Sequence, residues 1–191
     1  MNNALPMTVR LNESDRPELE KHFLSLRGDD RRLRFGSQIS DEGLKQYVAR
    51  IDFERDGVFA VHDDDDLRLL AVIHVATTAD CAELGLSVLH GHRGRGLGSA
   101  LFARAVTYLR NRGTREVFVH CLSENGPMMH LARKNHKRIL PEGNETDARL
   151  HLDPANAHTL FTEWLHEYHA AAVKTVRSNS RFAKKLLGYF G

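Results

Sequence analysis

Apolar positions along the chain follow two periods, and the switch between them marks the expected elements. Apolar and β-branched runs predict strands over residues 8–11, 57–62, 67–76, 81–89, 117–122, 137–140 and 148–152. Spacing of three to four residues predicts helices over residues 16–26, 40–51, 97–112, from 127 onwards and 155–176. The arginine-rich segment between residues 28 and 39 is expected to be a connection.

Strands that pair first by hairpins and later by helical crossovers give a mixed sheet with helices on both faces. The expected fold class is therefore α/β, an α+β arrangement around a mixed sheet. Neither a repeat nor a low-complexity linker divides the 191 residues. We expect one domain over residues 1–152 and a helical extension over residues 153–191 that packs on the same domain.

A glycine-rich turn joins the strand at 81–89 to the next helix. Gly94, Gly96 and Gly98 alternate with Arg93, Arg95 and Leu97. Glycine permits positive φ and leaves no Cβ to block a ligand. A strand that enters such a turn and leaves as a helix directs unpaired N–H groups and the positive end of the helix dipole at one place. The turn therefore predicts an anion site, most simply for a phosphate or a diphosphate.

The spacing of this turn excludes two common phosphate-binding motifs. A P-loop needs G-x-x-x-x-G-K-[ST], and the chain contains neither Gly-Lys-Ser nor Gly-Lys-Thr. A dinucleotide turn needs G-x-G-x-x-G, but the sixth position is Ser99 when counted from Gly94 and Leu101 when counted from Gly96. The pattern that does fit is R-x-x-G-x-G, formed by Arg93, Gly96 and Gly98. With its flanking strand and helix it resembles the acyl-CoA signature of the GNAT superfamily of N-acyltransferases.

A second segment resembles the other cofactor motif of that superfamily. Asn125 follows the predicted strand at 117–122, and Pro127 suits the first turn of a helix. The pattern N-x-x-M-x-x-L-x-x-K fits the motif, although Ala132 stands where the family often has tyrosine and His136-Lys137 replaces the usual Gly-Phe. The early segments R-R-L-R-F-G and S-D-E-G-L also resemble the first helical pair in a bacterial branch that includes the acetyltransferase domain of protein-lysine acetyltransferases.

The resemblance implies a GNAT-like acyl-CoA N-acyltransferase fold with an extra C-terminal helix. It also implies acetyl-CoA as co-substrate, with Val88 pairing its backbone with the pantetheine arm and Asn125 bonding the same arm. The implied cofactor-binding residues are Val88, Arg93, Gly94, Arg95, Gly96, Leu97, Gly98, Ser99 and Asn125.

Transfer of an acetyl group to an amine by direct attack needs an uncharged amine, yet a lysine-type amine has a pKa of about 10.4. A general base is therefore useful, and Glu83 is the best candidate because a carboxylate in an apolar strand is costly to bury unless it is used. The alternative is a structural glutamate bonded to backbone or arginine, and His90 and His120 are further bases. Ser123 or water is the expected proton donor to the leaving thiolate, since Ala132 cannot donate.

Composition, charge and cysteine usage exclude some classes of function and indicate the expected cellular compartment. The chain is 41% hydrophobic and 27% charged, with a formal net charge of +2, which is too small to indicate nucleic-acid binding. The sequence is expected to contain neither a membrane span nor a secretory signal. Cys81 and Cys121 have no CxxC spacing and are expected to be reduced core thiols of a cytoplasmic protein.

No metal site is expected. His166-Glu167-Tyr168-His169 is one residue short of H-E-x-x-H, so these histidines are expected on the polar, exposed side of a helix whose aromatic stripe packs inward. The basic, aromatic tail after residue 176 fits docking on its own domain, on a twin subunit or on an anionic surface.

The predicted function is an N-acetyltransferase that uses acetyl-CoA and accepts a small-molecule amine or a protein lysine. Two alternatives stay open: a non-catalytic acyl-CoA sensor or regulatory module, and a basic-tail protein that binds nucleic acid or lipid.

Overall fold

The structure is a computed structural model that describes residues 6–63, 68–78, 81–120, 125–135, 139–140 and 147–171. Within these residues, seven strands form one mixed sheet in the order β1-β2-β3-β4-β5-β7-β6. Every neighbouring pair is antiparallel except β4 and β5, which run parallel. The strands are β1 Val9–Arg10, β2 Gly57–His62, β3 Leu69–Thr77, β4 Cys81–Val88, β5 Glu116–His120, β6 Ile139–Leu140 and β7 Asp147–His151.

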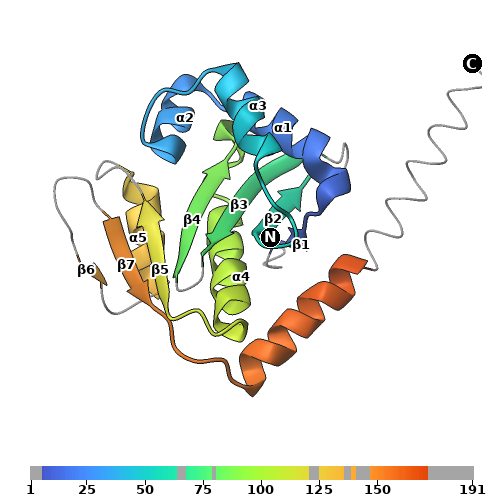
Figure 1. Cartoon of the computed structure of the whole chain (residues 1–191), viewed down its shortest axis with the longest axis vertical. Helices are drawn as coiled ribbons and strands as arrows, with labels where there is room; N and C mark the ends of the chain where they lie inside the picture. The colour runs from blue at the N-terminus through green and yellow to red at the C-terminus, as the bar shows by residue number, and fades with distance from the viewer. Residues whose placement is uncertain are drawn as a thin grey trace, which may run out of the picture.

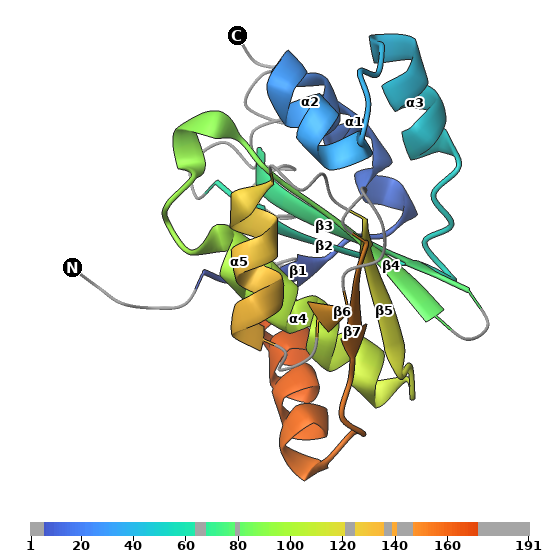
Figure 2. The same cartoon turned by 90° about the vertical axis from the view of Figure 1, so that its left-hand side faces the viewer.

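Helices cover both faces of this sheet (Figures 1 and 2). One face lies under α1 Arg16–Leu24, α2 Gly28–Phe35 and α3 Asp41–Ala49, and the other under α4 Leu97–Asn111 and α5 Gly126–Asn135. A last helix over residues 157–171 lies beside α4. The expected α/β mixed-sheet fold class is confirmed. In the described part of the chain, no helix has the length and apolar character needed to cross a bilayer.

The two layers of helices bury two separate cores. In β2, Val58 and Ala60 belong to the core under α1 and α3, whereas Phe59 and Val61 belong to the core under α4. Successive side chains of a strand point to opposite faces, so a strand covered on both sides must be apolar at nearly every position. This arrangement explains the continuous apolar runs in β2 and β3.

The parallel pair β4 and β5 separates before β4 ends. The last paired residues are Glu83 and Phe118, while β4 continues to Val88. The remaining length of β4 is held on its other side by β3, where Val88 pairs with Ala71. Among the described residues, the edge of β4 that faces β5 therefore has no strand partner over its second half. This opening is where the candidate site lies.

The segment predicted as a connection over residues 28–39 contains a helix, so that prediction is wrong. Asp29 and Asp30 lie in the first turn of α2 and Arg32 and Arg34 in its last turn, which complements the helix dipole at both ends. Gly36 ends α2 in the left-handed conformation with φ of 76°. The sequence hid this helix because few of its residues are apolar and periodicity therefore gave no signal.

The C-terminal helix is turned the opposite way from the prediction. Its aromatic stripe faces solvent, and Phe161, Trp164 and Tyr168 are each about 60% exposed. Its acidic side packs inward, where Glu163 and Glu167 pair with Arg104 of α4. Arg104 is only 3% exposed, and these two carboxylates compensate the charge of its buried guanidinium.

His166 is likewise not a surface histidine as predicted. Its ring Nδ1 lies 3.1 Å from the hydroxyl oxygen of Thr8, on the inward side of the same helix. Within the described residues, no group of histidine, cysteine and carboxylate side chains could hold a metal ion.

Cys81 is not the core thiol that was predicted. It is partly exposed at the start of β4, where its sulfur lies 2.9 Å from the Thr78 hydroxyl. Cys121 and the tail beyond residue 171 lie outside the described residues.

Candidate active site

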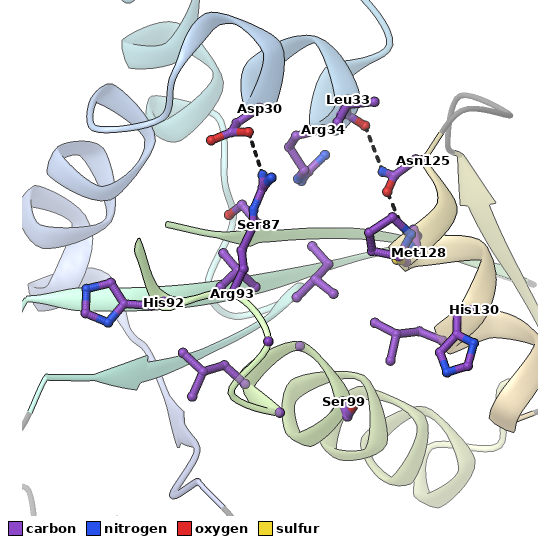
Figure 3. Close-up of a pocket in the computed structure, with 18 of the residues that line it drawn as sticks. Asp30, Leu33, Arg34, Ser87, His92, Arg93, Ser99, Asn125, Met128 and His130 are labelled. Carbon is purple, nitrogen blue, oxygen red and sulfur yellow. Dashed lines mark hydrogen bonds and ion pairs between the residues drawn. The ribbon is translucent and has the colours of Figure 1, made fainter. Parts of the chain in front are cut away.

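A cavity of about 580 Å³ opens where β4 and β5 separate. Figure 3 shows its walls: α2 above, β4 and the glycine turn on one side, and α5 on the other. The lining combines the end of β4, the start of α4 and the start of α5. The residues are Leu26, Asp30, Leu33, Arg34, Leu86, Ser87, Val88, His92, Arg93, Gly94, Gly96, Leu97, Gly98, Ser99, Asn125, Pro127, Met128, His130 and Leu131.

The glycine turn presents backbone donors to this cavity. Gly94 and Gly96 have φ of 73° and 78°, and a Cβ at either position would meet no atom within 4 Å. Glycine is needed there for its backbone conformation, and the space above it is open. In the described part of the protein, the amides from Gly94 to Ser99 have no hydrogen-bond acceptor. A row of such amides at the N-terminus of a helix binds anions.

Gly98 is needed for close packing and not for its backbone conformation. A Cβ at this position would lie 3.3 Å from the side chain of Leu86 and 3.5 Å from that of Leu131. The first turn of α4 therefore sits closely against β4 and α5, and these leucines give the cavity an apolar wall. The sequence placed Gly98 in the motif, but only the packing shows why the residue is small.

The two arginines of the glycine turn have different partners. The guanidinium of Arg93 forms an ion pair with Asp30 of α2 at 2.5 Å, which links α2 to the turn across the cavity (Figure 3). Asp30 is 7% exposed, and its second carboxylate oxygen is buried without a partner among the described residues. Arg95 instead contacts the ring Nδ1 of His92 at 3.0 Å and does not line the cavity. The positive charge expected beside the anion is therefore partly neutralised.

Asn125 lines the cavity and holds the start of α5. Its side-chain oxygen accepts a hydrogen bond from the Met128 amide at 3.3 Å, and its side-chain nitrogen donates to the carbonyl of Leu33 at 3.3 Å. One N–H of the side-chain amide is left over for a ligand.

Ser87 and His22 form a buried pair that the sequence did not reveal. Nε2 of His22, in α1, accepts a hydrogen bond from the Ser87 hydroxyl at 2.8 Å. Nδ1 of the same ring donates one to the carbonyl of Leu69 at 2.8 Å. The neutral ring suits both bonds, because one nitrogen donates and the other accepts. Burial lowers the pKa of His22 to about 4. Ser87 lines the cavity, so this buried pair ties α1 to the cavity wall.

The buried His22 predicts a loss of stability in acid. In the unfolded chain its pKa is near 6.5 and in the folded protein about 4, so the unfolded state binds the extra proton between these values. The contribution of His22 is complete above about pH 6.5 and is lost as the pH falls toward 4; the gap corresponds to roughly 3 kcal/mol. Urea unfolding at several pH values measures this.

The matched variant is His22→Gln, which cannot titrate in this range. It is expected to be less stable at neutral pH and to show a weaker decline between about pH 6.5 and pH 4.5 than the wild type. Equal slopes for the two proteins would contradict this account.

A second, smaller cavity of about 150 Å³ adjoins the first on the other side of Arg34. Its lining residues are Arg34, Phe35, Tyr47, His74, Ala76, Glu83 and Gly85. Glu83 therefore lies in a different cavity from Val88. Its carboxylate is exposed, not buried as the sequence argument assumed. Within the described residues, no hydrogen bond or ion pair engages the Glu83 carboxylate, and its role as a general base stays a prediction.

The other predicted catalytic residues are not brought to these cavities. Ser123 and the side chain of His120 lie outside the described residues, as does the side chain of Ala132. His90 is exposed in a 3-10 turn between β4 and α4 and lines neither cavity.

A chain of hydrogen bonds behind the second cavity was also missed. Asp56 accepts from Nε2 of His74 at 3.1 Å, His74 Nδ1 accepts from the Tyr47 hydroxyl at 2.6 Å, and Tyr47 accepts from Arg34 at 2.8 Å. Burial lowers the pKa of His74 and raises the pKa of Tyr47, so both are neutral near pH 7. Burial alone raises the pKa of Asp56, but hydrogen bonds from Arg55 and His74 hold it below its ordinary value. The only sequence signal was a histidine inside the apolar strand β3.

The comparison with known protein families agrees with this site geometry. A model of the acetyltransferase (GNAT) family matches residues 17–136, a span that includes the glycine turn and both cavities. The chain belongs to the GNAT acetyltransferase family. The resemblance noted from the two motifs is thereby confirmed, and acyl transfer is the general chemistry of the family.

Solved GNAT structures share the fold at low sequence identity. The GNAT domain of S. lividans PAT is 20% identical, with a TM-score of 0.62, and the match covers 76% of this chain and 89% of that one. The PaiA N-acetyltransferase of Thermoplasma acidophilum, solved with coenzyme A, is 16% identical with a TM-score of 0.57 over 76% of this chain and 97% of that one. The ribosomal-protein-S18-alanine N-acetyltransferase of Escherichia coli is 15% identical with a TM-score of 0.54 over 79% and 96%. No curated protein matches the sequence.

Proposed function

We propose that this GNAT protein moves an acetyl group from acetyl-CoA to a primary amine. The observation that supports the proposal most is the row of amides from Gly94 to Ser99 without protein acceptors, placed at the N-terminus of α4 and open to the larger cavity. Backbone donors in this arrangement suit a diphosphate. The acceptor amine is a small molecule or a protein lysine.

The rest of the coenzyme fits the walls of the same cavity. The unpaired edge of β4 near Val88 can bond the pantetheine arm as an added strand would. Leu86, Leu97 and Leu131 give this path an apolar lining, and Asn125 retains one N–H donor. A GNAT neighbour with the same fold was crystallised with coenzyme A, which supports this assignment.

The thioester would reach the place where the two cavities adjoin, and the amine would enter from the smaller one. Glu83 is the proposed general base, because an alkylammonium with a pKa of about 10.4 must lose a proton before it attacks. The thiol of coenzyme A has a pKa near 8.5, so the thiolate leaves without a strong acid. Ser123 or water is the proposed source of the proton that it takes up.

Calorimetry and a turnover assay test this proposal together. The full chain is titrated with coenzyme A and acetyl-CoA, and release of free thiol is then measured against a panel of primary amines that includes lysine peptides. We expect micromolar binding and amine-dependent thiol release. Absence of coenzyme binding would contradict the site. Binding without turnover on every amine would contradict the reaction and favour an acyl-CoA-binding module.

A further inference from the structure

Arg34 lies at the boundary between the two cavities. Among the described residues it is the only one that lines both. It projects from the last turn of α2 toward the end of β4 (Figure 3), and its guanidinium lies against the backbone of Gly85. A Cβ on Gly85 would be 1.9 Å from Cζ of Arg34, so this glycine is what makes room for the cation.

The hydrogen-bond chain described above ends on this guanidinium and fixes its position. Each link has one direction: Arg34 donates to Tyr47, Tyr47 to His74, and His74 to the buried carboxylate of Asp56. Asp56 is 2% exposed. The guanidinium also lies over the ring of Phe35, with Cζ 4.7 Å from its centroid. The cation is therefore preorganised before any ligand binds.

The fixed guanidinium has donors to spare. In the described part of the protein its Nε is buried without an acceptor, and no carboxylate forms an ion pair with it. Arginine carries five N–H donors, and the bond to Tyr47 uses one of them. Because Arg34 lines both cavities, the donors on its terminal nitrogens that the bond to Tyr47 leaves over are available to an acceptor atom of a ligand.

We propose that Arg34 is a catalytic residue that receives the carbonyl oxygen of the thioester and stabilises the negative charge formed there during acyl transfer. This inference rests on the proposed function. The amine nitrogen forms a bond to the carbonyl carbon and the C=O π electrons move to oxygen, beside the guanidinium. When the C=O bond re-forms, the C–S bond breaks and coenzyme A leaves as its thiolate. The ammonium nitrogen loses two protons in all: Glu83 takes the first before the attack, and the second leaves the nitrogen after the attack and passes through water to the thiolate.

The two cavities favour this role over recognition of an acidic acyl chain. An acyl group with a terminal carboxylate would extend beyond Arg34 into the smaller cavity, where the Glu83 carboxylate would repel it. A carbonyl oxygen at the boundary meets the guanidinium alone. A preorganised, partly desolvated cation is most effective at an oxygen where charge develops. Asp56, His74 and Tyr47 act through Arg34 and are positioning residues.

The test uses the full chain and the best amine from the panel. Arg34→Met removes the charge and keeps a similar length, and Arg34→Lys keeps the charge without the planar guanidinium. Tyr47→Phe removes the two hydrogen bonds of the hydroxyl, to Arg34 and to His74, and keeps the ring. Arg50→Met, at an exposed position outside both cavities, is the matched control for loss of one arginine. Turnover number, KM for both substrates and calorimetric affinity for coenzyme A are measured, with circular dichroism as the check on folding.

Arg34→Met is expected to lower kcat by about 100- to 1,000-fold, with the affinity for coenzyme A changed less than about threefold. Arg34→Lys should recover part of this loss, Tyr47→Phe should lower kcat about tenfold with KM nearly unchanged, and Arg50→Met should match the wild type.

Several results would overturn the inference. An unchanged kcat in Arg34→Met would do so, as would a loss confined to succinyl-CoA or a loss of coenzyme affinity in place of kcat. If Arg34→Met does not fold, an unchanged kcat in Tyr47→Phe and Arg34→Lys together would be equally decisive. A wild type that binds coenzyme A but turns over no amine would instead remove the proposed function, and this inference with it.

Discussion

Replacing Gly96 by glutamate is expected to weaken coenzyme A binding by at least about 100-fold while the protein stays folded. The space above Gly96 is open, so the new side chain fits, but it places a carboxylate beside the proposed diphosphate site. Two like charges about 4 Å apart near a protein surface repel by about 4 kcal/mol, which exceeds the roughly 2.7 kcal/mol of a 100-fold change. Isothermal titration with coenzyme A measures the effect.

The chain offers a matched control for this substitution. Gly113, in the turn after α4, has φ of 77° and also has no atom within 4 Å of a built Cβ. Gly113→Glu therefore imposes the same left-handed strain, about 1–2 kcal/mol, and the same change in charge, but away from both cavities. It should lower thermal stability as Gly96→Glu does and bind coenzyme A like the wild type. Equal affinities for the two variants would show that the turn does not hold the diphosphate.

Replacing Glu83 by glutamine is expected to lower kcat by about 100- to 10,000-fold without a change in coenzyme A affinity. The amide keeps the shape of the carboxylate but cannot take a proton from the amine. Because an amine with a pKa near 10.4 loses its own proton in alkali, the rate of the variant should rise toward that of the wild type as the pH increases. Turnover between about pH 7 and pH 10 measures both effects.

The control for Glu83→Gln is the same substitution at Glu116. This glutamate is exposed at the start of β5, in register with Cys81 of the neighbouring β4, and lines neither cavity. Glu116→Gln should leave kcat and its pH dependence unchanged. If Glu83→Gln behaves in the same way, the base is another group or water.

Helix α2 contributes residues to the lining of both cavities. Asp30 of α2 forms an ion pair with Arg93 of the glycine turn, while Arg34, one turn later on α2, separates the larger cavity from the smaller one. α2 thus contacts the proposed binding sites of both substrates. The segment that carries most of this arrangement was expected to be an irregular connection, and its helical structure is what places Asp30 and Arg34 on the cavity side.

The sequence alone determined the strands, most helices and the glycine turn. These features depend on local signals: the period of apolar residues, and glycines at positions where positive φ is required, as at Gly94 and Gly96. The family resemblance followed from the same short segments. Such features can be recognised because the residues that produce them are close together in the chain.

Only the tertiary structure decided the polar contacts. Arg34, Tyr47, Asp56 and His74 lie on four separate segments and meet only after α2 and α3 fold onto the sheet. The C-terminal helix likewise places its acidic side against Arg104, which is far away in sequence, and its aromatic stripe in solvent. Hydrophobic patterning ranks positions by burial but does not pair donors with acceptors, and the free energy of these buried polar groups depends on that pairing.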